Sequence, residues 1–478
     1  MKIFTFLLLA LPLLAQGPAQ PPPPARFPAQ IPGSGLTRSD PGQFQGSVAA
    51  GQASASITLS LQDAIDRGLK NNLGLLVRTT GTELARVEHI RALSALLPTI
   101  AGNISETASQ INLATFGFHV PNVPTVIGPF GYTDVRASAS QTIFDWTAVK
   151  NRRSAEENQR AADLSVQDAR DLVVQGVGSA YLQIISDQAR IDATRAVVAT
   201  AQALYERARD QHQAGVSPAI DELRAQVELK TEQQTLIAEQ NLLDKDKLVL
   251  ARVIGLPGGQ VFTLSESAPY AALEGLTPEE MLKRAYENRP DYKSALSQVH
   301  AAEIARQAAQ AERYPTVGVD ANYGDIGRNL GSSHGTFTVT GSVRFNVYDG
   351  GRIRADIVQA DAIIQQRKNE LAELQGQIDQ QVRSALIDLN TARDQVVVAR
   401  DNLNLANQTL EQARDRFAAG VADNIEVVQA QQSVANANQS LISAVLLHNL
   451  AKVSLARAVG AAETSLKQFM AGSNGGGR

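Results

Sequence analysis

The sequence contains no cysteine, few aromatic residues and no long uninterrupted apolar run after its first residues. The absence of cysteine excludes disulfide bonds, thiolate metal sites, a cysteine nucleophile and a lipid-anchored N-terminal cysteine. Aromatic residues make up 5% of the 478 residues and hydrophobic residues 44%, many of them Ala, Val and Leu, which favours thin helical layers over one thick core. The net charge of −4, without a Lys/Arg cluster, predicts no nucleic-acid partner.

Motifs of the common enzyme classes are also missing. The histidines are scattered, and no two lie at the spacing of a metal-ligand pair. The chain has no phosphate-binding loop and no Gly-x-Ser-x-Gly sequence. We therefore expect a protein that is not an enzyme and that has no catalytic residues, cofactor or metal centre.

The N-terminus has the features of an export signal. Lys2 precedes an apolar run over residues 3–14, and Ala15 is a small residue at a plausible cleavage point. We interpret residues 1–15 as a signal peptide, with a buried N-terminal helix as the alternative, because the run is too short to span a bilayer as a helix. Residues 16–56 are rich in Pro, Gly, Ala, Gln and Ser, which predicts a flexible leader.

Two very long helices are predicted because two long stretches contain no proline. At about 1.5 Å per residue, each is a rod on the order of 100 Å long. Apolar residues recur along them at steps of three and four, which is typical of coiled coils, and their other faces are polar. Such helices suit the wall of a water-filled tube. The long helices, their tips and the return helices are expected at 147–214, 215–218 and 218–255, and at 351–419, 420–423 and 424–460.

The chain is a tandem duplication of one unit of about 210 residues. Residues 276–321 align without a gap on residues 59–104 at an offset of 217, and the two Ala-Gly-Val tips align at an offset of 205. Each half begins with short helices, over 59–97 and 277–314. We predict a first repeat at 57–255, a linker at 256–275, a second repeat at 276–460 and a C-terminal tail at 461–478.

After each Pro-Thr pair the apolar period changes from 3.6 to 2, which predicts a β-hairpin in each half, over 98–144 and 315–348. Strands of about ten alternating residues match tilted transmembrane strands around a wet lumen. An ordinary half-exposed hairpin is the alternative. Lipid permits no open sheet edge, and four strands are too few to close a barrel, for which about eight are the minimum. Several chains must therefore share one barrel if these strands lie in lipid.

Aromatic and then basic residues follow the second strand of each hairpin. We interpret them as an aromatic girdle with cations that contact lipid headgroups, although a solvated helix start is the alternative. The predicted membrane-interface residues are Phe144, Trp146, Tyr348, Lys150, Arg152, Arg153, Arg352 and Arg354.

The tips are predicted to be tight helix turns at the end far from the strands. Gly215 and Gly420 are expected to adopt left-handed backbone conformations. Ser217 is predicted to cap the next helix, with Pro218 at its first position, and Asp423 to cap the helix of the second copy.

Together these features resemble the TolC family of outer-membrane efflux proteins, from residue 57 to about residue 460. The resemblance rests on five features. They are the leucine-rich segment at residues 59–72, the similar segment of the second half that ends with Asn288-Arg289-Pro290-Asp291, the Pro-Thr pairs before the strands, Asp349-Gly350-Gly351 and the duplicated tips. It implies a mainly α protein with β structure: a homotrimeric, twelve-stranded barrel in outer-membrane lipid, continuous with a long α-helical coiled-coil barrel through the periplasm. Substrate passes through it without being transformed.

The resemblance also implies partners and site residues. A periplasmic adaptor protein would dock on the tips and link them to an inner-membrane pump of the RND or ABC type. The tip residues are Gly215, Val216, Ser217, Gly420, Val421 and Ala422.

Family members close the periplasmic end with inward-coiling helices and an acidic constriction, to which Asp221 and Glu426 correspond by position. This chain has Gln429 at a second acidic position, Phe417 in place of a tyrosine and Ala422 in place of an arginine, which favours closure by packing over a polar latch. Capping or helix N-terminus compensation is the alternative role of the two carboxylates.

Two other functions remain open from the residues. A secreted structural coiled-coil protein would explain the rods but not the alternating strands. A passive outer-membrane porin would explain the strands but would not need duplicated tips.

Overall fold

The structure, a computed structural model, describes residues 44, 46–49, 51, 56–117, 123–266, 270–271, 273, 275–419, 421 and 424–471. The chain divides into two compact units, Met1–Asp40 and Pro41–Arg478, and every described residue belongs to the second. The second unit is therefore described by itself. The predicted signal peptide, Gly420, Ala422 and Asp423 lie outside the described residues.

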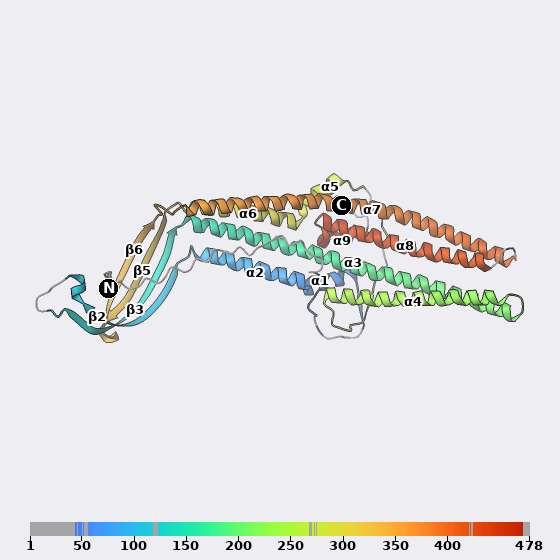
Figure 1. Cartoon of the computed structure of the whole chain (residues 1–478), viewed down its shortest axis with the longest axis horizontal. Coiled ribbons are helices and arrows are strands. Elements are labelled where there is room, and N and C mark those ends of the chain that lie inside the picture. The colour runs from blue at the N-terminus through green and yellow to red at the C-terminus, as the bar shows by residue number, and fades with distance from the viewer. Residues whose placement is uncertain are drawn as a thin grey trace, which may run out of the picture. The chain divides into compact units, whose positions relative to one another are not determined.

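Helices and strands follow the same order in the two halves of this unit: two short helices, a β-hairpin, a long helix and a return helix (Figure 1). The first half comprises β1 (Ile57–Leu59), α1 (Leu61–Asn71), α2 (Leu73–Ser94), β2 (Thr99–Asn112), η2 (Leu113–Phe116), β3 (Val126–Phe144), α3 (Trp146–Gln213) and α4 (Ala219–Ile254). The second comprises β4 (Phe262–Leu264), α5 (Pro278–Asn288), α6 (Pro290–Ala311), β5 (Thr316–Gly327), η3 (Leu330–Ser332), β6 (His334–Arg344), α7 (Arg352–Ala418), α8 (Asn424–Ala458) and α9 (Ala462–Ala471).

The two hairpins form one antiparallel sheet in the order β2-β3-β5-β6. Strand β3 pairs with both β2 and β5, so the hairpins join edge to edge in the middle of the sheet. Strands β2 and β6 are the two outer strands, and within the described residues each has one unpaired edge. The strands are longer than the ten residues expected, since β2 has 14 and β3 has 19.

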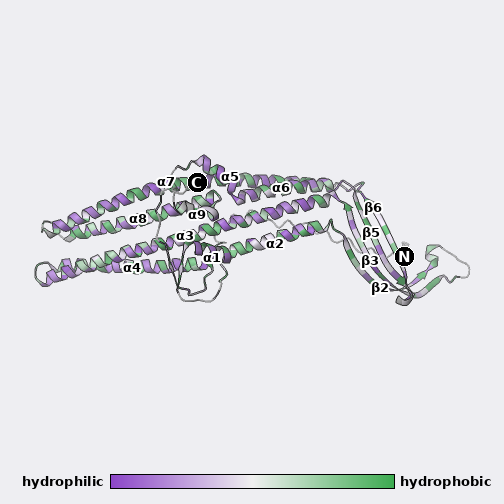
Figure 2. Cartoon of the chain, turned by 180° about the vertical axis from the view of Figure 1, so that it is seen from behind, coloured by the Kyte–Doolittle hydropathy of each residue, from purple (hydrophilic) through white to green (hydrophobic). Residues whose placement is uncertain are grey.

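Apolar and polar residues lie on opposite faces of this sheet. Opposed residues share a face, and the register places Ile100 beside Ala139, Ala321 and Val339 across all four strands. The apolar face is uncovered in the single chain: the side chains of Ile100 and Phe337 are each 77% exposed. Figure 2 shows apolar residues along strands that have no protein layer packed over them.

The long helices are packed side by side in the second unit. Helix α3 contacts α2, α4, α6 and α8, and α7 contacts α6 and α8. Helix α6 therefore packs against both long helices, whereas α2 packs along α3 and has no comparable contact with α7. The corresponding short helices α2 and α6 thus pack against different numbers of long helices within one chain.

Buried side chains concentrate where the short helices, the return helices and the linker meet. One core cluster combines residues of α1, α3, α4, α8 and α9, and a second combines α5, α7 and α8. A small parallel sheet of β1 and β4 joins the start of the first repeat to the linker.

Parts of two predicted segments, the C-terminal tail and the flexible leader, have ordered structure. The predicted tail forms α9, because Ala462, Leu466 and Met470 recur at intervals of four and are buried in the core. The predicted leader is anchored near its end: Phe44 is buried, and its carbonyl accepts a 2.6 Å hydrogen bond from the side-chain amide of Asn72.

Candidate functional site

The α3–α4 tip has the glycine turn that the sequence predicts. Gly215 has φ 72°, and its N–H donates to the carbonyl of His212 at 2.9 Å, which closes the end of α3. The side chain of Val216 is 76% exposed at the turn. The predicted cap was wrong: α4 begins at Ala219, its N-cap is Pro218 and no side chain caps it. The Ser217 hydroxyl instead lies 3.5 Å from the Pro218 carbonyl, so it does not reach the N–H groups of α4.

Polar side-chain contacts close the same tip. Nδ1 of His212 lies 2.7 Å from a carboxylate oxygen of Glu222, which joins the last turn of α3 to the first turn of α4. Asp221, a predicted gate residue, lies in the first turn of α4 with Arg224 at 3.8 Å. Acidic residues in the first turn offset the positive end of the helix dipole. Asp221 and Glu222 therefore also stabilise the tip locally.

At the α7–α8 tip, the predicted gate residues separate into different environments. Glu426 of α8 forms a 3.3 Å ion pair with Arg416 of α7, so this pair joins the two helices across their tip. Phe417 packs against a small core of Ala413, Val427 and Ala430. Gln429 is exposed, and so is Val421 beside the turn.

An aromatic contact links the two tips. The guanidinium of Arg207 on α3 lies 5.0 Å from the centroid of the Phe417 ring on α7, within the range of a cation–π interaction. Phe417 therefore holds the end of one helix pair against the other. Glu426 and Asp221 belong to different tips, and within this chain each is paired with a neighbouring arginine.

The start of each long helix carries a capping aspartate that the sequence analysis did not predict. Asp145 accepts a hydrogen bond from Ala148 N at 3.0 Å, and Asp349 accepts from Gly351 N and Ile353 N at 3.0 and 2.8 Å. These carboxylates supply negative charge at helix N-termini that otherwise carry only cations.

Of the eight predicted membrane-interface residues, Phe144 and Trp146 are in contact with each other and several cations have partners in the chain. Phe144 and Trp146 are stacked with ring centroids 6.4 Å apart, and Lys150 lies 5.3 Å from the Trp146 ring centroid. Arg352 pairs with Glu312 at 2.6 Å. Arg152 pairs with Glu156, whereas Arg153, Arg354 and Tyr348 are exposed, and neither of these two arginines forms an ion pair with a described residue.

One polar residue of the sheet was missed because a single charge in an alternating strand carries no special pattern. Arg136 of β3 contacts Asp134 at 3.2 Å and Thr336 of β6 at 3.1 Å, and it also bonds Asn322 of β5. It therefore joins three strands on the polar face of the sheet.

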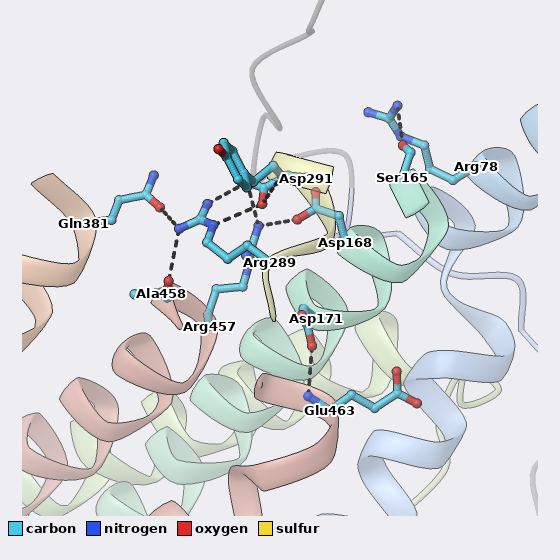
Figure 3. A network of polar contacts seen from close by, with 11 residues as sticks. Arg78, Ser165, Asp168, Asp171, Arg289, Asp291, Gln381, Arg457, Ala458 and Glu463 are labelled. Carbon is cyan, nitrogen blue, oxygen red and sulfur yellow. Dashed lines mark hydrogen bonds and ion pairs between the residues drawn. The ribbon is translucent and has the colours of Figure 1, made fainter. Parts of the chain in front are cut away.

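A buried network of charges joins helices from the two halves of the chain where the core clusters meet (Figure 3). Arg289, only 2% exposed, donates to Asp291 at 2.6 and 3.0 Å, to the Gln381 side chain at 2.7 Å and to the Ala458 carbonyl at 3.2 Å. It thus connects the start of α6 with α7 and the end of α8.

Arg457 on α8 extends this network to α3. It binds Asp168 and lies 3.9 Å from Asp291. Asp171, one turn further along α3, accepts a 2.9 Å hydrogen bond from the Glu463 N–H at the start of α9. Figure 3 shows these residues converging from α3, α6, α7, α8 and α9.

Burial and partner charges set the protonation of this network. Burial raises the pKa of Asp168 to about 6, even though Arg457 opposes the shift. Burial also acts to raise the pKa of Asp291, but hydrogen bonds from the Arg289 guanidinium outweigh it and hold that pKa below its ordinary value. The network is therefore a structural joint in which the pKa of the Asp168 carboxyl group lies at about 6.

One helix in the described part of the chain, Ile425–Ala458, is long and apolar enough to cross a membrane by composition. However, 56% of its most apolar window is buried inside the protein. The helix also carries the buried polar residues His448, Asn449 and Lys452. These features are typical of a core helix.

Comparisons with known proteins agree with this architecture. The family model described as "Outer membrane efflux protein" matches residues 64–256 and 281–461. The chain is 25% identical over 440 residues to outer membrane protein OprJ of Pseudomonas aeruginosa, covering 84% of each chain. It is 23% identical over 423 residues to the probable efflux pump outer membrane protein SepC of Pseudomonas putida, covering 84% of this chain and 83% of SepC.

Solved structures share the fold. The outer membrane protein VceC of Vibrio cholerae matches with a TM-score of 0.71 at 18% identity, covering 84% of this chain and 96% of VceC. The MtrE outer membrane channel of Neisseria gonorrhoeae matches with a TM-score of 0.70 at 18% identity, covering 87% and 94%. The family match covers two segments that together span most of the chain, in agreement with the sequence resemblance: the protein belongs to the outer membrane efflux protein family.

Proposed function

We propose that this protein forms the outer-membrane exit duct of a tripartite export system, as a homotrimer with a twelve-stranded barrel. The family match and relatives named as efflux pump outer membrane proteins support the export role. One observation of the structure carries the assembly: a four-stranded sheet with two open edges and an uncovered apolar face. In lipid both features must be satisfied, and a further copy of the same sheet supplies the missing edge.

The edges match each other through the repeat. Within the chain, Ser140 of β3 pairs with Thr99 of its own hairpin and with Asp320 of the next. In the second hairpin, Thr316 corresponds to Thr99 by the offset of 217, and its partner is Arg344 of β6. Arg344 therefore corresponds to Ser140. Ser140 pairs with a residue on each side, whereas Arg344 pairs only with Thr316, on one side of β6.

That missing partner can be named. The residue equivalent to Asp320 is Asn103 of β2, by the same offset of 217. We therefore propose that β6 of one copy pairs with β2 of the next, with Arg344 opposite Asn103 and, two residues along, Ser342 opposite Ser105. All four residues are polar, as expected for one face lining a wet lumen.

The packing of the helices also supports contact between neighbouring copies. Helix α6 packs against both α3 and α7, whereas its counterpart α2 packs against α3 and has no comparable contact with α7. The side chains of Val77 and Leu84 on α2 are 61% and 65% exposed, and Ile387 on α7 is 63% exposed. We propose that α7 of the neighbouring copy covers α2, which repeats the α6–α7 contact between chains.

The tips carry the proposed link to the rest of the system. We propose that Gly215, Val216 and Ser217, with Gly420, Val421 and Ala422, dock a periplasmic adaptor, which connects to an inner-membrane transporter of the RND or ABC type. Asp221, Glu426, Gln429 and Phe417 are proposed to form the closed periplasmic end. Because Glu426 is paired with Arg416 in this chain, opening would require that ion pair to rearrange.

The cysteine-free sequence allows a direct cross-linking test of the shared barrel. Cα atoms of opposed strand residues lie about 4.5–5.5 Å apart, within the range of a disulfide. A chain carrying Ser105→Cys and Ser342→Cys should form disulfide-linked trimers on mild oxidation in the membrane.

The matched control pairs Ser342→Cys with Ala101→Cys, which lies four residues, or about 13 Å, from the proposed partner on the same face. It should stay unlinked. Equal linking of both pairs would contradict the register, and the absence of any linked species would contradict a barrel shared between copies.

A further inference from the structure

The two helix pairs that lead to the tips, α3–α4 and α7–α8, differ in the residues along the seam where the two helices meet (Figure 1). In the second repeat, Ala413 of α7 and Ala430 of α8 lie in one core cluster beside the tip. Steps of seven residues away from the tip, in opposite directions along the two antiparallel helices, follow the same seam. They reach only alanines: Ala406 with Ala437, Ala399 with Ala444, and Ala392 with Ala451.

The equivalent positions of the first repeat, 205 residues earlier, are mostly acidic. Nearest the tip, Ala208 and Ala225 are still alanines, and both are buried. The next three pairs are Ala201 with Glu232, Thr194 with Glu239, and Asp187 with Asp246. The carboxyl groups of the last pair lie within hydrogen-bonding reach of each other, in agreement with this register. Four acidic residues of the α3–α4 seam therefore occupy positions where the second repeat has alanine.

The Asp187 carboxyl group is buried without a cation to neutralise it. The residue is 2% exposed, and Oδ1 accepts a 3.0 Å hydrogen bond from Nε2 of Gln183. No N–H or O–H group of the described residues donates to the buried Oδ2. Arg190, also on α3, acts on this carboxyl group through space without forming an ion pair. Helices α2, α6 and α8 also pack on α3, but none of their described residues forms an ion pair or hydrogen bond with Asp187.

A shared proton makes the contact between the two aspartates favourable. Two ionised carboxylates in contact repel each other and neither can donate a hydrogen bond, whereas a protonated carboxyl group donates one to its neighbour. The proton needs no cavity, because it lies between two oxygen atoms that already meet. Burial, and then the contact with Asp246, raises the pKa of Asp187 to about 6. Asp187 is therefore protonated in mild acid and ionised above neutral pH.

The other acids of the seam act in the same direction. Glu232 is 7% exposed, and burial together with the nearby Glu228 and Glu239 raises its pKa. Glu239 accepts a 3.5 Å hydrogen bond from Gln439 of α8, but its Oε2 is buried with no partner among the described residues. Because Asp187 and Glu232 are buried inside one chain, a neighbouring copy brings no counter-charge into contact with them.

We propose that the α3–α4 pair is fastened by protons, with one proton shared by Asp187 and Asp246 in mild acid. Release of this proton to solvent as the pH rises loosens α4 from α3, while the alanine-lined α7–α8 pair stays closed. Because the pKa of Asp187 is raised from 3.8, its contribution is fully present below pH 3.8 and is lost as the pH rises through about 6. The inference does not depend on the trimer or on the export role, since every contact that carries it lies within one chain.

Hydrogen–deuterium exchange of the full-length, detergent-purified protein tests the proposal helix by helix. Exchange is compared at pH 5 and pH 8 after correction for the intrinsic effect of pH on the amides. With a pKa of about 6 for Asp187 in the closed pair and 3.8 in the open one, protection of α4 amides between residues 232 and 246 should fall about tenfold. Protection of α8 amides between residues 430 and 444 should change by less than about twofold.

Two variants remove the shared proton. Asp187→Asn donates an amide hydrogen bond to Asp246 at every pH. The double variant Asp187→Ala with Asp246→Ala copies the buried Ala392–Ala451 pair of the second repeat. Each should fold and should reduce the pH dependence in α4 to less than about threefold. Asp244→Ala is the matched control, because it removes an exposed carboxylate from the same turn of α4, and it should keep the tenfold change.

Three results would overturn the proposal. One is protection in α4 that does not change with pH. A second is an equal loss of protection in α4 and α8, because this would mark unfolding of both helix pairs together. The third is a pH dependence that survives in a folded variant of either kind, or that Asp244→Ala removes as completely as they do.

Discussion

Arg289 offers the most quantitative test of the buried charge network, because its side chain binds α6, α7 and the end of α8 together. Replacing it with methionine removes four hydrogen bonds, two of them to the Asp291 carboxylate at 2.6 and 3.0 Å. Asp291 is then left with Arg457 at 3.9 Å and the Tyr292 N–H at 2.9 Å. Loss of one partner of a buried ion pair typically costs about 3–5 kcal/mol, so Arg289→Met should lower the free energy of unfolding by that amount.

A double-mutant cycle separates the ion pair from general packing. Asp291→Asn alone should also be strongly destabilising because it leaves the Arg289 guanidinium buried and unpaired. The double variant should lose less than the sum of the two, with a coupling free energy of about 2–3 kcal/mol for a charge-assisted pair.

Denaturant unfolding in detergent, followed by circular dichroism of the helices, measures these values. Arg284→Met is the control. Arg284 and Glu280 form a 2.8 Å ion pair within α5, but the Arg284 side chain is 52% exposed. It should change stability by less than about 1 kcal/mol. A loss for Arg289→Met no larger than that of Arg284→Met, or purely additive effects in the cycle, would refute the role of the network.

Three further predictions concern the tips and the joint. Gly215→Val should abolish export and adaptor cross-linking in cells while leaving the protein in the outer membrane, because a β-branched residue is strained at φ 72°; normal export by the variant would argue against docking at this tip. Glu426→Gln should alter cation selectivity in single-channel recordings, and unchanged selectivity would remove Glu426 from the lumen. Because burial raises the pKa of Asp168 to about 6, its contribution to stability is fully present below pH 3.8 and is lost as the pH rises through 6. Asp168→Asn should therefore flatten the wild-type gain in stability on acidification from pH 7 to 4, by up to about 3 kcal/mol, and an unchanged pH profile would contradict the shift.

Features that depend on local periodicity could be predicted from the sequence. The change of period after Pro98 and Pro315 marks both hairpins, and the proline-free runs mark α3 and α7 to within about a residue. Gly215 was identified because a helix that ends in a tight turn favours a left-handed glycine. Its neighbour Ser217 was misassigned because Pro218 shifts the start of α4 to Ala219.

Features that depend on residues distant in the chain could not be predicted. Arg289 was quoted only as part of the Asn288-Arg289-Pro290-Asp291 motif, and its partners Gln381 and Ala458 lie 92 and 169 residues away. Helix α9 was missed because its ten residues become helical by packing against α3 and α8. The same reason applies to Phe44, which lies in a composition typical of disorder and is held by burial in the core and by the hydrogen bond from Asn72.

The central claim is that one chain supplies a third of a closed barrel. Native mass spectrometry of the intact protein released from detergent micelles tests it most directly, because it counts the copies in the particle. The account predicts a complex of three chains as the stable species. A stable single chain under conditions that keep the sheet folded would contradict it.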